Sequence, residues 1–191
     1  MPGACKDVLA DLIEKFGRPP IIQRTLPVES GKIKDAWRVP SWVAGGLVFD
    51  DHGRIALVKH HPGLGWEDIW VPPGGLLETG ETADDGFRRE VREETGLEVD
   101  DLSVTRIFNN AYEEPSGKRY PFYFVQFVSH AATHELRPDD VEVREAHWFD
   151  ALPRKMAFYD DYREDYRLWR ARMLDRGRSS ASRRSKPSSR N

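Results

Sequence analysis

Cysteine and long hydrophobic runs are scarce in this sequence. It holds a single cysteine, Cys5, among 191 residues, and no further zinc ligands lie near it. An internal disulfide and a zinc site at this residue are therefore excluded. The strongly apolar runs, such as residues 42–49 and 122–128, are much shorter than the roughly 20 residues that a membrane helix requires. The first residues carry acidic side chains and lack the apolar core of a signal peptide. We therefore expect a soluble, cytoplasmic protein.

Acidic residues are absent from residues 176–191, which hold six basic residues and many serines. This composition predicts a disordered basic tail. The net charge of the whole chain, -3, indicates no particular partner. The length allows one domain with extensions, and we expect residues 1–40 to form an N-terminal extension with a short helix. Residues 41–155 would form the domain, and residues 156–175 a C-terminal helix.

Hydrophobic periodicity predicts an alternation of helices and strands. Apolar residues recur at helical spacing in residues 6–16 and 159–175. Runs of apolar, β-branched and aromatic residues predict strands at 42–49, 54–60, 102–108, 120–128 and 145–149. The first two of these strands flank the turn sequence DDHG and predict a β-hairpin. Together with the acidic helix described next, the order of elements predicts an α/β fold in which helices pack on a mixed sheet.

An acidic segment between Gly74 and Leu97 predicts a helix with an unusual charge pattern. Thr82 is a helix-capping residue, and Gly96 follows the last helical residue. At 100° per residue, Glu90, Glu93 and Glu94 share one face. Like charges at these spacings cost a helix roughly 0.2 to 0.5 kcal/mol per pair. A hard divalent cation such as Mg²⁺ would reverse the sign of this interaction. A solvated acidic face is the alternative.

Gly86 falls on the carboxylate face of the same helix. A glycine inside a helix costs about 1 kcal/mol relative to alanine. We therefore expect a close approach at this position, and our hypothesis is that a bound cation and its phosphates need the space.

The acidic segment resembles the signature of the Nudix hydrolase family, G-x5-E-x7-R-E-U-x-E-E-x-G-U, where U is aliphatic. All nine defined positions match, at Gly75, Glu81, Arg89, Glu90, Val91, Glu93, Glu94, Gly96 and Leu97. The resemblance extends from about Trp42 to Pro153. It implies an α/β/α sandwich and a hydrolase that uses Mg²⁺ or Mn²⁺ to cleave a nucleoside diphosphate linked to another group.

The resemblance also implies roles for individual residues. The implied catalytic group consists of Glu90, Glu93, Glu94 and Arg89. The three glutamates would be metal ligands, joined by the carbonyl of Gly75, whereas Glu81 and Arg89 would brace the loop against the helix. The general base would be Glu93, or a glutamate of a later loop such as Glu142 or Glu145.

Substrate recognition must come from residues outside the signature. Aromatic faces stack on nucleobases, and polar side chains bind ribose or phosphate. Our candidates for these contacts are His60, Trp66, Asn109, Tyr112 and Glu142. Taken alone, each of them is more typical of an ordinary core, loop or surface residue.

A small nucleotide is the expected substrate, without a membrane or nucleic-acid partner. Two alternatives stay open, namely an RNA 5′-end pyrophosphohydrolase that uses the basic tail and a non-catalytic module that senses a nucleotide. The two flanking helices could build a homodimer interface.

Overall fold

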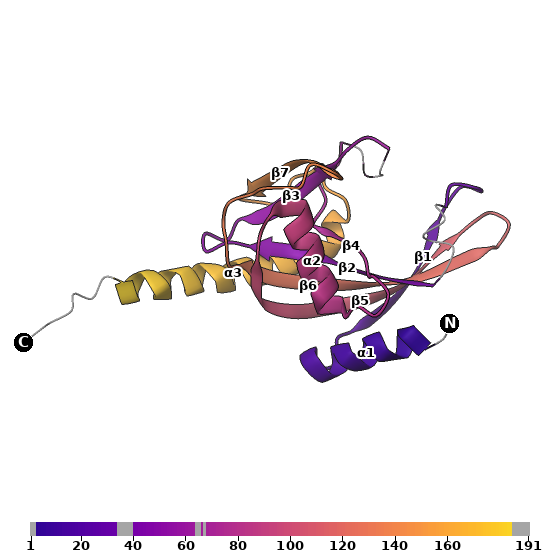
Figure 1. Ribbon diagram of the computed structural model, residues 1–191, viewed down its shortest axis with the longest axis horizontal. Coiled ribbons are helices and arrows are strands. Elements are labelled where there is room, and N and C mark those ends of the chain that lie inside the picture. The colour runs from indigo at the N-terminus through magenta and orange to yellow at the C-terminus, as the bar shows by residue number, and fades with distance from the viewer. Residues whose placement is uncertain (1–2, 34–39, 64–65, 67, 185–191) are drawn as a thin grey trace, which may run out of the picture.

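The computed structural model describes residues 3–33, 40–63, 66 and 68–184, which form a mixed seven-stranded sheet between helices (Figure 1). The strands are β1 (Ile21–Pro27), β2 (Ser41–Phe49), β3 (Ile55–His60), β4 (Gly74–Leu76), β5 (Val99–Glu113), β6 (Arg119–Ala131) and β7 (Val143–Phe149). The helices are α1 (Gly3–Phe16), α2 (Ala83–Thr95) and α3 (Tyr159–Arg184). The strand order is β1-β5-β6-β2-β3-β7, and β4 pairs with β2 beside this path.

Helices cover both faces of the sheet. Successive side chains of a strand point to opposite faces, so each strand supplies both hydrophobic layers. On one face Phe87 of α2 stacks on Phe127 of β6 with 4.9 Å between ring centroids, and Phe16 of α1 meets the same ring edge-on. On the other face Tyr162 and Met173 of α3 are buried in a second cluster. The predicted α/β fold with helices on both sides of a mixed sheet is confirmed.

The sheet divides between β2 and β3, and this division creates an opening. The two strands form the predicted hairpin but pair only at Val48 with Ala56 and at Phe49 with Ile55. Farther from the turn, residues 71–76 lie between them, because Val71 bridges to β3 and β4 pairs with β2. Residues of β4 are therefore accessible to side chains from both faces.

Two segments differ from the sequence prediction. Strand β1 lies in the predicted N-terminal extension, yet it pairs in parallel with β5 over its whole length. The predicted C-terminal helix begins at Tyr159 and runs on to Arg184, so residues 176–184 of the predicted disordered tail are helical. Arginine and alanine favour continuation of a helix that has already formed. Residues 185–191 lie outside the described residues.

None of the helices in the described part of the chain is long and apolar enough to cross a membrane.

Candidate active site

Helix α2 presents the three glutamates of the signature away from the core. Its start is confirmed, because Oγ1 of Thr82 accepts a hydrogen bond from the amide of Asp85 at 3.3 Å. Its end is also confirmed, with Gly96 as the capping residue. Phe87 and Val91 are fully buried against the sheet. Because these residues anchor one face of the helix, the acidic face points toward β3 and β4.

Arg89 connects α2 to the loop that precedes it. Its Nε and Nη2 atoms donate to the two carboxylate oxygens of Glu81 at 2.9 and 3.0 Å, and Nη2 also donates to the carbonyl of Leu76 at 3.0 Å. A bidentate pair of this kind fixes both partners. The hydrogen bond with Arg89 lowers the pKa of Glu81 below its usual value. The remaining nitrogen, Nη1, donates to Glu90 at 2.8 Å and to Glu93 at 3.1 Å.

Glu94 is the most buried of the signature glutamates, with 4% of the residue exposed. One carboxylate oxygen lies 2.7 Å from Nε2 of His60, and the other accepts a hydrogen bond from the amide of Gly74 at 2.8 Å. Burial raises the pKa of Glu94, whereas His60 acts in the opposite direction. The hydrogen bond with Glu94 in turn raises the pKa of His60.

Glu90 and Glu93 lie in different surroundings. The side chain of Glu90 is 13% exposed and that of Glu93 is 49% exposed. Burial raises the pKa of Glu90 to about 7, and the negative charge of Glu94 contributes in the same direction. The carboxylate of Glu90 also lies against Gly75, where a Cβ atom would overlap it. A larger residue at this position would displace the Glu90 carboxylate from β4.

The donor set is chemically suited to a hard divalent cation. Carboxylate and carbonyl oxygens are the ligands that Mg²⁺ prefers. Burial raises the pKa of Glu90 most, repulsion from Glu94 adds to it, and a cation between the two carboxylates would remove the repulsion. In the described residues no three His, Cys, Asp or Glu side chains converge as a complete ligand set. Instead Arg89 and His60 are the hydrogen-bond partners of these carboxylates.

The space at Gly86 is used by the protein itself. A Cβ atom at this position would overlap Cδ2 of Leu77 and would lie 3.0 Å from Oε2 of Glu81. The close approach expected from the sequence exists, but the hypothesis that a cation and phosphates occupy the space is wrong. The loop before α2 packs there, because the Glu81–Arg89 brace pulls this loop onto the helix.

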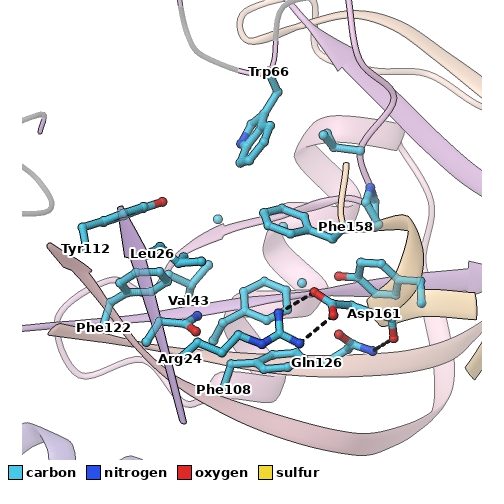
Figure 2. Close-up of a pocket in the computed structure, with 18 of the residues that line it drawn as sticks. Arg24, Leu26, Val43, Trp66, Phe108, Tyr112, Phe122, Gln126, Phe158 and Asp161 are labelled. Atoms are coloured by element: carbon cyan, nitrogen blue, oxygen red, sulfur yellow. Dashed lines mark hydrogen bonds and ion pairs between the residues drawn. The ribbon is translucent and has the colours of Figure 1, made fainter. Parts of the chain in front are cut away.

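A cavity of about 210 Å³ lies on the α3 face of the sheet (Figure 2). Alternate residues of four strands form its floor, since every second side chain of a strand points to the same face. They are Arg24 and Leu26 of β1, Phe108, Asn110 and Tyr112 of β5, Phe122, Phe124 and Gln126 of β6, and Val43 and Gly45 of β2. The cavity extends to His60, Gly74 and Gly75, and it therefore borders the signature glutamates.

Three of the five residues expected to contact substrate line this cavity, namely His60, Trp66 and Tyr112. Asn109 does not line it, because its side chain lies on the other side of the strand from the neighbouring Asn110. Glu142 is exposed and does not line it either, although its charge contributes to the raised pKa of His60.

Sequence reasoning missed an ion pair at the cavity floor. Nη1 and Nη2 of Arg24 donate to the carboxylate of Asp161 at 2.7 and 2.6 Å, and the guanidinium lies 3.9 Å from the ring centre of Phe108. Figure 2 shows this pair beside Phe108 and Gln126. Arg24 belongs to β1 and Asp161 to α3, 137 positions apart. No local pattern could have predicted the contact.

Two aromatic residues with unusual backbone conformations lie at the mouth of the cavity. Trp66 and Phe158 both have a φ angle of 57°, and their rings meet edge-on at 4.9 Å. Bulky residues rarely adopt positive φ angles, and such strain is common at functional sites. Figure 2 shows Trp66 across the cavity from Arg24 and Phe108. Trp66 and Phe158 both line the cavity together with Phe108 and Phe124.

Comparison with known proteins gives a consistent result. Residues 39–163 match the NUDIX domain. The chain is 30% identical over 134 residues to an ADP-ribose pyrophosphatase of Methanocaldococcus jannaschii, covering 69% of this chain and 75% of the relative. It is 27% identical over 113 residues to a NAD-capped RNA hydrolase NudC of Photorhabdus laumondii, covering 56% of this chain but only 38% of that protein.

A solved structure shares the fold. It is the NUDIX domain of Shewanella oneidensis NrtR in complex with ADP ribose, which superimposes with a TM-score of 0.54 at 18% identity. The superposition covers 74% of this chain and 95% of that domain.

Proposed function

The chain belongs to the Nudix hydrolase family, and from this premise we propose that it cleaves the diphosphate linkage of a small nucleotide in which a nucleoside diphosphate is joined to another group. ADP-ribose and nucleoside triphosphates are substrates of this class. Nudix hydrolases generally use divalent metal ions. For this chain we propose Mg²⁺, with Mn²⁺ as the substitute.

One observation carries the proposal, namely that the aromatic cavity reaches the residues that contact the signature glutamates. Gly74 and His60 line the cavity, and both bind the carboxylate of Glu94. A nucleoside in the cavity would therefore have its diphosphate beside the acidic face of α2. This arrangement supports cleavage of the diphosphate rather than of a bond in the base or the ribose.

The proposed metal ligands are Glu90, Glu93, Glu94 and the carbonyl of Gly75. A bound divalent cation neutralises charge on the phosphoryl oxygens and makes a bound water more acidic. The protein's own residues hold these ligands in position. The bidentate Arg89–Glu81 pair holds the loop that carries Gly75 against α2, and His60 and Gly74 fix the orientation of the Glu94 carboxylate.

The proton acceptor for the attacking water is proposed to be Glu93 or Glu142. Both carboxylates are accessible to water, and both lie near the other charged groups of the site. Glu145 is less suited, because two cations hold its carboxylate, Nζ of Lys59 at 3.5 Å and Nη2 of Arg144 at 3.2 Å, whereas Glu93 has one such partner, Arg89. Comparison of the Glu93→Gln and Glu142→Gln variants distinguishes the candidates, since only loss of the base lowers kcat and also removes the fall of kcat on the acidic side of the pH profile.

The test is a hydrolysis panel with identified products. Nucleoside triphosphates, ADP-ribose, sugar nucleotides and dinucleoside polyphosphates would be incubated with Mg²⁺, alongside a 5′-capped RNA. We expect cleavage within the diphosphate of at least one small nucleotide, and loss of this activity in Glu94→Gln. Deletion of residues 176–191 should leave that turnover unchanged. Turnover of the RNA alone, with salt-dependent loss on deletion, would contradict the proposal and support the RNA alternative.

A further inference from the structure

Gln126 has an acceptor atom that the protein does not use. The residue is fully buried in β6. Its Nε2 atom donates to Oδ2 of Asp165 at 2.6 Å and to the backbone carbonyl of Asp161 at 3.3 Å. Both partners can only accept, so the orientation of the amide is fixed. The other amide atom, Oε1, has no hydrogen-bond partner among the described residues.

The unpaired atom is held in place by a network beneath the cavity. Asp165 is 4% exposed and accepts further hydrogen bonds from Oγ1 of Thr105 at 2.7 Å and Nη2 of Arg106 at 2.6 Å. Three donors on one buried carboxylate make its position rigid. Gln126 therefore cannot turn its oxygen toward Asp165, and burial of an acceptor without a partner costs stability.

The surroundings of Gln126 offer this oxygen no donor from the protein. The nearest cationic side chain of the cavity floor, Arg24, directs two nitrogens to Asp161. Arg106, directly opposite Gln126 on β5, donates to Asp165 instead. The next residues on this face of β6 and β5 are the rings of Phe124 and Phe108. The cavity is lined by aromatic rings and by two buried oxygens without a hydrogen-bond partner among the described residues, Oε1 of Gln126 and Oδ1 of Asn110, so it suits a flat group with hydrogen-bond donors at its edge.

The position of Gln126 fits the base end of a nucleotide. Gln126 pairs across the sheet with Gly45, which pairs with Gly74 at the border of the acidic site. Two strand spacings of about 4.8 Å separate Gln126 from Gly74. A cavity of about 150 Å³ admits benzene, and this one, at about 210 Å³, is larger. It therefore accommodates a heterocycle over Phe108 and Phe124.

We propose that Gln126 selects the base of the substrate, with Oε1 accepting a hydrogen bond from an exocyclic amino group. This inference rests on the proposed function and adds the chemical class of the base. A base with an amino group satisfies the buried oxygen. A base without one leaves that oxygen unpaired in the complex, which penalises binding.

The test compares nucleotides that differ at the base edge. Binding of ADP and of purine riboside 5′-diphosphate, which lacks only the amino group, is measured by calorimetry in the presence of Mg²⁺. CDP with UDP, and GDP with IDP, form two further pairs. In the wild type we expect the amino-bearing member of at least one pair to bind on the order of tenfold more tightly. In Gln126→Met the ratio should fall to about one.

Thr105→Val is the matched control. It removes another donor to Asp165 but leaves Oε1 of Gln126 in place, so the tenfold ratio should persist. Thermal unfolding of each variant checks the fold. Should Gln126→Met fail to fold, the side-chain amide resonances of Gln126 in the wild type supply the answer. They should shift with ADP and not with the nucleotide that lacks the amino group.

Several outcomes would overturn the inference. If the wild type hydrolyses nucleotides but binds both members of all three pairs equally, Gln126 does not select the base, and the proposed function is unaffected. A wild-type penalty for removal of the ribose 2′-hydroxyl that disappears in Gln126→Met, with no such effect for the amino group, assigns the oxygen to the sugar. Failure of the wild type to hydrolyse any nucleotide in the panel rejects the proposed function itself.

Discussion

One carboxylate oxygen of Glu94 lies 2.7 Å from Nε2 of His60, although 34 positions separate these residues. The same carboxylate accepts a hydrogen bond from the amide of Gly74. Glu94 thus connects α2 to both β3 and β4, at the place where the sheet divides. A buried carboxylate needs such partners, because burial without them strongly disfavours the charged form. The contact aligns the acidic helix with the cavity on the opposite face of the sheet.

Glu94→Gln should therefore inactivate the enzyme without unfolding it. The amide keeps the size of the side chain but removes one ligand charge, so we expect kcat to fall by a factor on the order of 10². Turnover of the best substrate of the panel at saturating Mg²⁺ is the measurement. Glu98→Gln is the matched control, since Glu98 is exposed and its nearest ion partner, Arg92, lies at 3.9 Å. Full activity of Glu94→Gln would contradict the assignment.

Divalent metal should stabilise the folded protein. A ligand present at 100 times its Kd adds about 2.7 kcal/mol to the free energy of unfolding. For a chain of this size that corresponds to a rise in Tm of roughly 5 to 10 °C. Mg²⁺ or Mn²⁺ should produce this rise in the wild type and in Glu98→Gln, whereas a chelator should reverse it. An equal rise in the double variant Glu90→Gln/Glu94→Gln would place the metal elsewhere.

Local signals in the sequence predicted α2 well. Thr82 and Gly96 mark its ends, and the spacing of Phe87 and Val91 identifies its buried face. The close approach at Gly86 was also predictable, because only a tight contact justifies a glycine inside a helix. The residue that fills the space could not be predicted, because Leu77 reaches it through the path of the preceding loop.

Features that depend on long-range pairing could not be predicted in this way. Strand β1 has alternating exposed and half-buried residues but little hydrophobic contrast, and its pairing with β5 defines it. The incorrect prediction that Asn109, and not Asn110, contacts the substrate has a related cause. Adjacent identical residues give no polar–apolar contrast that would set the phase of the strand, and an error of one position moves a side chain to the other face.

Gly86→Ala should lower stability despite the better helix propensity of alanine. The propensity gain is about 1 kcal/mol, whereas overpacking against Leu77 costs roughly 1 to 3 kcal/mol. We expect a net loss of about 1 kcal/mol in urea unfolding. In a Leu77→Ala background the overlap disappears, and the same substitution should become stabilising by about 0.5 to 1 kcal/mol. Additive effects of the two substitutions would show that Leu77 does not occupy this space.

Glu81→Gln should destabilise the protein in a pH-dependent manner. Arg89 lowers the pKa of Glu81 below its ordinary value of 4.5, so the ionised carboxylate contributes stability above about pH 4.5. This contribution is lost as the pH falls through the lower folded-state pKa. Near pH 7 we expect a loss of roughly 1.5 to 3 kcal/mol, because the hydrogen bonds involve charged groups.

The difference in urea unfolding between the wild type and Glu81→Gln should shrink steadily as the pH falls below 4.5. Glu78→Gln in the same loop is the control, since the residue is exposed. A difference that does not change between pH 7 and pH 3 would mean that the Arg89 contact is not what stabilises the loop.

Trp66→Ala should weaken substrate binding and leave the chemical step intact. The indole lies across the cavity from Phe108, where it can stack on a base, and such stacking contributes about 1 to 3 kcal/mol per base. We expect KM to rise by roughly tenfold with kcat unchanged, because the interaction is equal in the ground and transition states. Leu168→Ala, a substitution of an exposed apolar residue on α3, should change neither constant. A fall in kcat at constant KM would instead indicate that Trp66 acts on the reacting diphosphate, and the base would then have to bind without this ring.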